Sequence, residues 1–478
     1  MSRFALVVAI SLGVILGGNA VANAGSVTFS ILAQVPLASE ATLLSAVDFT
    51  GDGVSDAVLF LPGASTLSLY PGNGSGFQAP IPVAVSGTPI SVATGDLNED
   101  GLIDLVVGEN GGLVEVFGPD GLGGYVLLDS VSTGSGAPAV VLAQLDDDDH
   151  LDLAVAVNAL MIPGGGVAVY QGTGLGTFPI ASGFSAANEV TALLAEDFDG
   201  DSDIDLMVGI SPFAGFSSVD LHLNDGLGNF GTGSTAATGF GGTFAAADFN
   251  NDGLMDFATS VFNFFCFNNV EVYLNQPSGG FVFTQALPTA CGPYRVLADD
   301  FDDDGNMDVV YSDGGDFVPA VNGIPIGLGD GTGAFTLCPF APTAALSLSS
   351  PLVGRFDGDD LPDLLATSIF ITDLIVYRND TVVVSTFERG DANADGLFNI
   401  ADAIFSLTSL FVGGSPAPTC LDAADANDDG AFDVADAVFS LSSLFVSGSP
   451  SPPAPFGACG IDPTSGDPLG CGAFAACP

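Results

Sequence analysis

A nine-residue acidic phrase recurs seven times and constrains the fold more than any other feature of this chain. Its copies are 48 to 55 residues apart. They begin at Asp48, Asp96, Gln144, Asp197, Asp248, Asp300 and Arg355. Most copies read acid-x-acid-x-acid-Gly-x-x-Asp, and short apolar runs such as residues 43–47 and 105–107 flank them. Apolar runs on both sides of a polar turn predict a β-hairpin, and the spacing leaves room for about four short strands, which is one propeller blade.

A second phrase supports this prediction. After a strand, most repeats have a Gly-rich turn and then Phe, as in residues 167–178 and 219–230. Seven copies with no half repeat predict a closed ring, because closure removes the exposed edges of the sheets. We expect the N-terminal strand, residues 26–32, to complete the last blade beside residues 371–377. The predicted fold class is therefore all-β, a seven-bladed β-propeller followed by a small α-helical calcium-binding domain.

The two phrases, in this order, resemble the FG-GAP/VCBS repeats of integrin α-subunit propellers and of many secreted bacterial proteins. The resemblance covers about residues 40–380. It implies a seven-bladed propeller with calcium in the hairpin loops, and it does not imply one function.

The acidic phrases are predicted to bind calcium. Positions 1, 3 and 5 of a tight loop direct side-chain oxygens inward, position 7 adds a backbone carbonyl, and Asp at position 9 closes the cage. Hard oxygen donors without His or Cys select calcium over zinc or copper, and carboxylates this close repel one another without a cation. The predicted propeller ligands are Asp48, Asp52 and Asp56; Asp96, Asn98, Asp100 and Asp104; Asp146, Asp148 and Asp152; Asp197, Asp199, Asp201 and Asp205; Asp248, Asn250, Asp252 and Asp256; Asp300, Asp302, Asp304 and Asp308; and Asp357, Asp359 and Asp363.

Two copies differ at position 1, where Gln144 and Arg355 replace the acid. The third copy also has Asp149 in place of Gly, and Thr50 replaces the acid at position 3 of the first copy. Up to seven calcium ions are expected in the propeller, and whether the loops at Gln144 and Arg355 hold one stays open.

From Arg389 the pattern changes to two calcium loops, each followed by a helix. Both loops place oxygen ligands at positions 1, 3, 5, 9 and 12 and Gly at position 6, as in an EF-hand, with Asp in place of the usual final Glu. Apolar residues at helical spacing follow in residues 400–411 and 434–445, so we expect the two helices to pack on each other. The predicted ligands are Asp391, Asn393, Asp395, Asn399 and Asp402, and Asp425, Asn427, Asp429, Asp433 and Asp436.

This duplicated unit resembles a type I dockerin over residues 390–446, which implies two calcium sites and docking onto a cohesin module. Dockerins of this type usually carry Ser or Thr late in the loop and basic residues further along the helix. Here residues 400–401 are Ile-Ala, residues 434–435 are Val-Ala, and no Lys or Arg follows Arg389. A cohesin-like partner, a different partner and a purely structural module therefore stay open.

The composition restricts the partners. The chain has 57 acidic and five basic residues among 478, a formal net charge of −52, and such a surface repels nucleic acids and anionic membranes. The N-terminus reads as a signal peptide, with Arg3, an apolar run at residues 5–16 and a small-x-small cleavage site before Gly25. The apolar run is too short to span a bilayer. We expect a secreted, extracellular or cell-surface protein that is not membrane-embedded.

Four segments are predicted along the chain. They are a signal peptide at 1–24, the propeller at 25–388, the dockerin-like module at 389–446 and a tail rich in Pro, Gly and Cys at 447–478. Seven cysteines agree with an oxidising compartment. Cys266 and Cys291 can pair within one repeat, and Cys338 is then the odd one. The four cysteines that can form two C-terminal bridges are Cys420, Cys459, Cys471 and Cys477.

The leading functional hypothesis is a non-enzymatic, calcium-binding adhesion or binding protein. Its propeller would hold an extracellular protein or glycan, and its C-terminal module would tether it to a partner. Two alternatives stay open: a polysaccharide-degrading enzyme (an O-glycosyl hydrolase) or its accessory module, and a structural cell-surface component.

Few residues outside the loops carry chemistry. Glu109, Glu115 and Glu271 lie near strands, and a glycosidase would need two such carboxylates on either side of a cleft. His150 and His222 lie in no nucleophile motif, so no catalytic residue is predicted. Residues 389–391 spell Arg-Gly-Asp, an integrin-ligand tripeptide, but Asp391 is also the first ligand of a calcium loop.

Overall fold

The computed structural model describes residues 27–460 except for short gaps. The gaps are 40, 62–65, 135, 138, 147, 158–164, 187–188, 211–216, 262–268, 290–294, 313–323, 341–347, 369–371, 382–386 and 413–414. The chain divides into two compact units, Met1–Thr381 and Val382–Pro478. The predicted signal peptide lies outside the described residues, and so do Cys266, Cys291, Cys471 and Cys477.

The first unit consists of seven antiparallel sheets of four strands each. Blade 1 contains β2 (Thr42–Val47), β3 (Asp56–Phe60), β4 (Thr66–Tyr70) and β5 (Ile81–Ala84). Blade 2 contains β6 (Pro89–Gly95), β7 (Asp104–Glu109), β8 (Leu113–Pro119) and β9 (Tyr125–Ser132). Blade 3 contains β10 (Val140–Ala143), β11 (Asp152–Val157), β12 (Gly166–Gln171) and β13 (Ile180–Ser185). Blade 4 contains β14 (Val190–Glu196), β15 (Asp205–Ile210), β16 (Ser218–His222) and β17 (Ser234–Thr238).

The remaining three blades repeat this order. Blade 5 contains β18 (Phe240–Ala247), β19 (Asp256–Val261), β20 (Asn269–Asn275) and β21 (Phe281–Pro288). Blade 6 contains β22 (Val296–Asp299), β23 (Asp308–Tyr311), β24 (Ile324–Gly329) and β25 (Phe335–Phe340). Blade 7 contains β26 (Leu348–Gly354), β27 (Asp363–Ser368) and β28 (Asp373–Asn379), together with β1 (Phe29–Pro36) from the N-terminus. The predicted all-β, seven-bladed propeller is thus confirmed.

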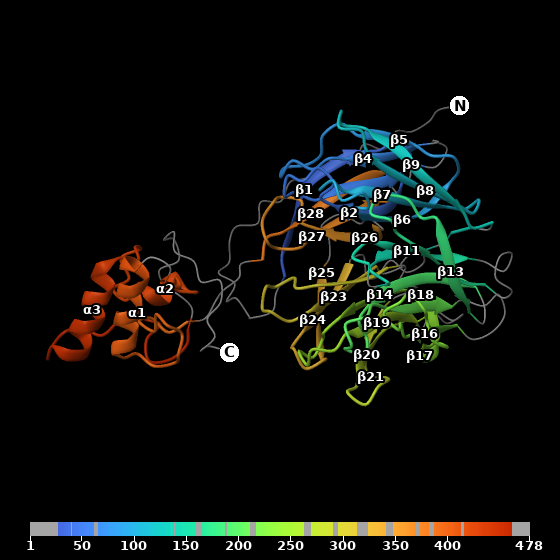
Figure 1. Cartoon of the computed structure of the whole chain (residues 1–478). Helices are drawn as coiled ribbons and strands as arrows, with labels where there is room; N and C mark the ends of the chain where they lie inside the picture. The colour runs from blue at the N-terminus through green and yellow to red at the C-terminus, as the bar shows by residue number, and fades with distance from the viewer. Residues whose placement is uncertain are drawn as a thin grey trace, which may run out of the picture. The chain divides into compact units, whose positions relative to one another are not determined.

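The ring closes through the first strand of each blade and through β1. Each first strand contacts the first strands of both neighbouring blades, and β26 of blade 7 contacts β2 of blade 1. The N-terminal strand β1 pairs antiparallel with β28, from Phe29 opposite Asn379 to Pro36 opposite Asp373. Figure 1 shows this closure as the blue β1 beside the orange β28. The two ends of the propeller therefore share one sheet, as the sequence predicts.

The core lies between the blades. The second strands, such as β7, β11 and β15, are buried along their whole length, because each sheet is covered on both faces by its neighbours. The Phe of the Gly-rich phrase packs edge-on against a residue of the preceding blade, the one that follows position 1 of that blade's acidic loop. Phe335 lies 5.4 Å from Phe249 and Phe77 lies 5.9 Å from Phe356, measured between ring centroids. These aromatic pairs join blade 6 to blade 5 and blade 1 to blade 7.

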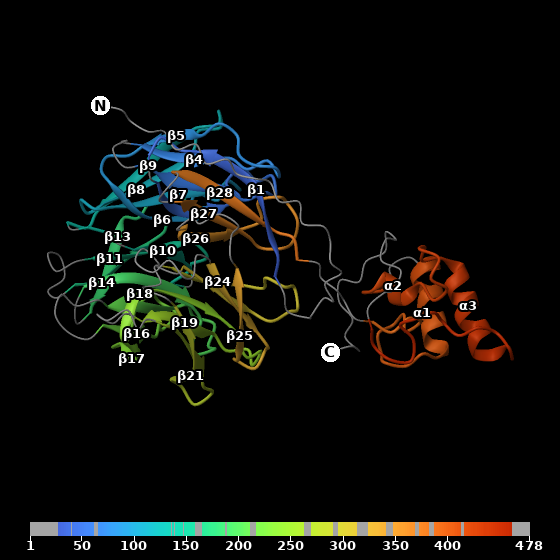
Figure 2. The same ribbon diagram turned by 180° about the vertical axis from the view of Figure 1, so that it is seen from behind.

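The second unit is helical in its described part. It contains α1 (Ile400–Phe411), the short α2 (Leu421–Ala424) and α3 (Val434–Phe445), and α1 lies beside α3 (Figure 2). Small and polar side chains are buried in the two long helices: Asp402, Ala403, Ser406, Asp436, Ala437 and Ser440. The predicted apolar stripe is therefore only partly buried, since Ile404 and Val438 each keep 56% of their surface exposed. The stripe extends further round the helix than the contact between the two helices.

Three further observations concern sulfur and membranes. Cys420 and Cys459 are both disulfide-bonded, and Cys338 is a free thiol. Among the described residues, no helix is both long enough and apolar enough to cross a bilayer.

Candidate metal centres

The seven acidic loops lie at one end of the ring. Each loop joins the first strand of a blade to the second, and position 9 is the first residue of the second strand, as at Asp56 of β3 or Asp308 of β23. All first strands contact each other around the ring and are followed by the same hairpin. The loops therefore share one face of the propeller.

The Asp at position 9 ties each hairpin together. All seven of these residues are at most 1% exposed. In every loop one carboxylate oxygen accepts a backbone N–H from position 2, at 2.8–3.1 Å. In six blades the other oxygen accepts a backbone N–H from the end of the third strand, at 2.5–2.8 Å. This role is not apparent from the sequence alone, and the closing of a calcium cage by position 9 stays a prediction.

Blade 2 differs at this position. There the residue that would donate to the second oxygen is Pro119, which has no N–H. Asp104 Oδ1 is accordingly buried without a hydrogen-bond partner. Burial is the main cause that raises the pKa of Asp104 to about 6.

The acid at position 1 stabilises the turn of the loop by accepting a backbone hydrogen bond. In the five loops that have it, one carboxylate oxygen accepts the backbone N–H of position 6 at 2.7–2.9 Å. Position 6 is Gly in four of the five, for example Gly253 with φ of 86°, a conformation that costs Gly little. In blade 6 this local turn brings the carboxylates of positions 1, 3 and 5 within 4.8 Å of one another.

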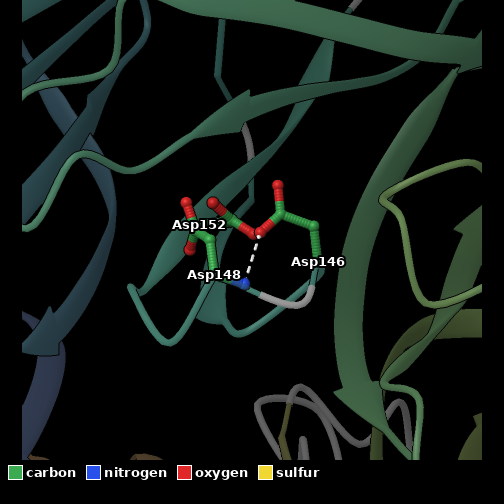
Figure 3. Close-up of side chains that lie close together, drawn as sticks. All are labelled: Asp146, Asp148 and Asp152. Carbon is green, nitrogen blue, oxygen red and sulfur yellow. Dashed lines mark hydrogen bonds between the residues drawn. The ribbon is translucent and has the colours of Figure 1, made fainter.

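Three loops bring three carboxylates within 4.8 Å of one another. Their members are Asp146, Asp148 and Asp152; Asp197, Asp199 and Asp205; and Asp300, Asp302 and Asp304. Figure 3 shows the first of these clusters, in which the backbone N–H of Asp148 donates to Asp146 Oδ1 at 3.1 Å. Clusters of oxygen donors at this separation can hold a metal ion.

The acidic loop of blade 6 contains a buried, unpaired carboxylate oxygen and carboxyl groups with raised pKa values. Asp302 Oδ1 is buried without a hydrogen-bond partner, and burial together with Asp304 and Asp300 raises the pKa of Asp302 to about 6. Burial also raises the pKa of Asp308 to about 8. A buried, unpaired carboxylate oxygen is costly unless a cation compensates it. The donor set, all oxygen and all hard, suits calcium.

The loops of blades 3 and 7 are arranged differently at position 1. Gln144 Nε2 donates to the carbonyl oxygen of Asp149 at 3.0 Å. Arg355 Nε donates to the carbonyl oxygen of Asp360 at 3.2 Å, and its two terminal nitrogens each lie 3.3 Å from an oxygen of Asp299 at the end of β22. These two side chains donate hydrogen bonds where the acids of the other loops accept them.

The two C-terminal loops match each other closely. Asp391 and Asp425 are fully buried, and the backbone N–H groups of Gly396 and Gly430 donate to their Oδ2 atoms at 2.8 Å. Each helix begins with a capping box in which the side chains of positions 9 and 12 take part. Burial is the main cause that raises the pKa of Asp402 to about 6 and the pKa of its counterpart in the second loop to about 7.

Arg389 lies at the centre of this unit. It is fully buried over the ring of Phe387, donates from Nη1 to the carbonyl oxygens of Asp422 and Asp425, and pairs with Asp428 at 3.1 Å. Asp391 is equally buried. The Arg-Gly-Asp tripeptide is therefore part of the interior of the unit and offers no exposed adhesive motif.

The three glutamates singled out near strands and the two histidines have structural partners. Glu109 and Glu115 are 2% and 3% exposed and face each other; Gly87 N–H donates to Glu109, and Ser86 donates from its N–H and hydroxyl to Glu115. Glu271 accepts a hydrogen bond from the Tyr273 hydroxyl.

The two histidines are also engaged. His150 pairs with Glu99 of the neighbouring loop at 2.6 Å. His222 is buried, stacks on Phe184 with 4.1 Å between ring centroids, and hydrogen-bonds the carbonyl oxygen of Gly231. Neither arrangement resembles a nucleophile with its base.

Comparisons with known proteins agree with this architecture. The family described as FG-GAP-like repeat matches residues 48–107 and 197–259. A chain in a crystal structure of BBS1N in complex with ARL6DN, soaked with mercury, matches with a TM-score of 0.51 at 10% identity, covering 75% of this chain and 99% of that one. The same complex soaked with lead gives 0.50 at 12% identity, covering 74% and 97%.

These matches define the fold and leave the activity open. The structural likeness at this level of identity concerns the fold alone, and no curated protein matches the chain. The sequence and the sheets together describe a seven-bladed β-propeller, of which residues 48–107 and 197–259 match the FG-GAP-like repeat.

Proposed function

We propose that this chain is an extracellular, calcium-stabilised binding or adhesion protein. The observation that carries the proposal is the acidic loop of blade 6, where three carboxylates lie within 4.8 Å of one another and Asp302 Oδ1 is buried without a partner. Calcium in such loops would compensate the buried charge and fix the shape of the loop face. A rigid face of loops on a closed ring is a common platform for ligands.

In this proposal the residues named as ligands hold the ion and the chain performs no reaction. The side chains named as ligands in the propeller loops and in the two C-terminal loops supply only carboxylate and amide oxygens, so they suit calcium. The ion would supply positive charge that the chain, at −52, lacks. Ligand-binding specificity would then depend on the side chains that the fixed loops present.

A protein partner is proposed for both units. Both similar crystal structures contain BBS1N in complex with ARL6DN, so a chain of this fold takes part in a protein complex. In the C-terminal unit, Ile404 and Phe411 of α1 and Val438 and Phe445 of α3 are 56–68% exposed. Matching apolar positions on paired helices favour attachment to another protein, and a cohesin-like module is one candidate.

Glycoside hydrolysis is not proposed. The only facing pair among the glutamates named above is Glu109 with Glu115, and both are buried and hydrogen-bonded to the backbone. A glycosidase needs two carboxylates that reach the substrate from either side of a cleft.

The full chain tests the proposal in two steps. Native mass spectrometry of the calcium-loaded protein should show bound calcium, and a chelator should lower the melting temperature. The protein should then bind members of an array of extracellular proteins and glycans with calcium and lose binding with chelator. Absence of bound calcium would refute the calcium role, and release of reducing ends from a polysaccharide panel would refute the non-enzymatic role.

A further inference from the structure

The third strand of each blade ends opposite the acidic loop, and one residue there distinguishes two blades from the other five. By strand register this residue faces the Asp at position 9. It is Pro71, Gly118, Gln171, Leu223, Leu274, Leu328 and Arg378 in blades 1 to 7. Only blades 3 and 7 have a side chain there that can donate a hydrogen bond.

Both donors point at the same place in the loop. Gln171 Nε2 donates to Asp146 Oδ2 at 2.6 Å. Arg378 Nε lies 3.9 Å from Asp357 Oδ2, and the same guanidinium also pairs with Asp380. Asp146 and Asp357 both occupy position 3 of their loops.

The same two blades are those without an acid at position 1. Gln144 and Arg355 there donate to the carbonyl oxygen of position 6, which is Asp149 or Asp360. In the other five loops the direction is reversed, and the acid at position 1 accepts the N–H of position 6. Two positions that are distant in sequence, position 1 of the loop and the residue at the end of the third strand, thus change together in blades 3 and 7.

We propose that the loops of blades 3 and 7 are held by side-chain donors in place of calcium, so that the propeller takes five calcium ions and not seven. Gln171 hydrogen-bonds the position-3 carboxylate of blade 3, and the guanidinium of Arg378 places a positive charge 3.9 Å from that of blade 7, where a cation would otherwise bind. Gln144 and Arg355 replace the carboxylate that would otherwise bind that cation. This inference rests on the proposed calcium binding of the remaining loops.

The contrast with blade 6 supports the assignment. There Leu328 occupies the strand position of Gln171, and Asp302 Oδ1 at position 3 is buried without a partner. The oxygens of Asp146, Asp148 and Asp152 also lie within 4.8 Å of one another, so proximity alone does not separate blade 3 from blade 6. The difference is the amide nitrogen of Gln171, because a donor already in hydrogen-bond contact competes with a cation for the same oxygen.

Calcium counts on the full chain test this directly. Native mass spectrometry should find seven ions, five in the propeller and two in the C-terminal loops. Position 5 offers matched variants: D148N in blade 3 and D359N in blade 7 should leave the count unchanged. D201N in blade 4 and D304N in blade 6 should each lower it by one.

The outcomes separate the inference from the proposed function. A count that falls by one in D148N or D359N overturns the inference and leaves calcium binding intact. A wild-type protein without calcium overturns the proposed function and the inference with it.

A second variant covers the case in which the asparagine variants do not fold. Gln171→Leu gives blade 3 the residue that blades 4, 5 and 6 have. Because it removes the amide nitrogen that competes with a cation for Asp146, it should lower the melting temperature in chelator, and calcium should reverse part of that fall. A variant that melts at the wild-type temperature in chelator would overturn the inference, since the amide would then not hold the loop.

Discussion

Asn275 Nδ2 in blade 5 donates a hydrogen bond of 2.6 Å to the carbonyl oxygen of Phe198, which follows position 1 of the blade 4 loop. The same nitrogen donates to Met255 in its own blade at 3.1 Å. Asn224 and Asn379 do the same, with Leu145 and Phe301 as acceptors in the preceding blade. One amide group thus joins each of three acidic loops to the next blade.

In blades 3 and 6, which have Gly where blades 4, 5 and 7 have Asn, a backbone N–H makes this contact. Gly176 N–H donates to the carbonyl oxygen of Leu97 at 2.9 Å, and Gly333 N–H donates to that of Phe249 at 3.0 Å. At five boundaries, therefore, the residue after position 1 is hydrogen-bonded to the next blade. The shape of a loop and the packing of the ring are coupled through this carbonyl.

Replacing Asn275 by Ala should destabilise the propeller by about 2 kcal/mol, because two buried carbonyl oxygens lose their donor. Chemical denaturation of the full chain measures this. Asn229→Ala is the matched control, since Asn229 is exposed and bonds only within its own turn, and it should change stability by no more than about 0.5 kcal/mol. Equal effects of the two substitutions would contradict the role of Asn275.

Replacing Pro119 by Ala should stabilise the protein. The new N–H can donate to Asp104 Oδ1, as Gly172 donates to Asp152 in blade 3 at 2.7 Å. A hydrogen bond to a charged group contributes more than the loss of a proline costs through the unfolded state, so the expected gain is about 1 kcal/mol. The pKa of Asp104 should also fall from about 6.

The control for this substitution is Pro82→Ala. Pro82 is exposed on the outer strand β5. The N–H that alanine would introduce there has, among the described residues, no buried, unpaired carboxylate to donate to. Urea titration should show no gain for this variant. If Pro119→Ala were no more stable than Pro82→Ala, the missing donor would not be the reason that Asp104 is unpaired.

Calcium should stabilise the chain more at pH 8 than at pH 5.5. Burial and neighbouring carboxylates raise the pKa of Asp205 and Asp302 to about 6 and that of Asp308 to about 8 in the metal-free loops. These values lie above the ordinary 3.8, so the folded calcium-free state holds more protons and loses stability as pH rises. Bound calcium removes that penalty. Melting curves with calcium and with chelator at both pH values measure the difference, and a gap that is larger at pH 5.5 would contradict it.

His222 should make the fold less stable in acid. Burial lowers the pKa of His222 below its ordinary 6.5, so the unfolded chain binds the proton first and stability falls as pH drops through 6.5. His222→Phe keeps the stacking on Phe184 and loses the hydrogen bond to Gly231. The variant should be about 1 kcal/mol less stable than wild type at pH 8, and the gap should narrow toward pH 5. A gap that stays constant from pH 8 to pH 5 would exclude a buried neutral imidazole.

The sequence predicts the blades because their signal is local and repeated. Each acidic phrase with its flanking apolar runs defines one hairpin, and the expected closing strand at residues 26–32 overlaps β1 at Phe29–Pro36. The role of the Asp at position 9 was not predictable, because a carboxylate that accepts backbone N–H groups and one that binds a cation look the same in sequence. Gln171 was missed for another reason: its partner Asp146 is 25 residues away and only the strand register brings them together.

The C-terminal helices show a second limit on what the sequence can predict. Their apolar stripe predicts two helices that contact each other, and α1 does lie against α3. Periodicity indicates which face is apolar but not how much of that face the partner covers. The apolar residues buried on the two helices are small, Ala403 and Ala437, whereas the long side chains of Ile404 and Val438 remain more than half exposed.

Glu109→Gln should stabilise the propeller at pH 8. The carboxyl of Glu109 shares a hydrogen bond with Glu115, and burial followed by this contact raises the pKa of Glu109 above its ordinary 4.5. The stabilising effect of the shared proton is complete below pH 4.5 and is lost as pH rises through the pKa of the folded state. Glutamine keeps a neutral donor toward Glu115 at every pH, so we expect a gain of about 1 kcal/mol at pH 8 that shrinks toward pH 5.

Glu115→Gln is the matched control and should destabilise, because its amide would face the two donors of Ser86. Thermal unfolding of both variants across this pH range decides the matter, and stabilisation by Glu115→Gln as well would show that simple charge removal, and not the shared proton, governs the pair.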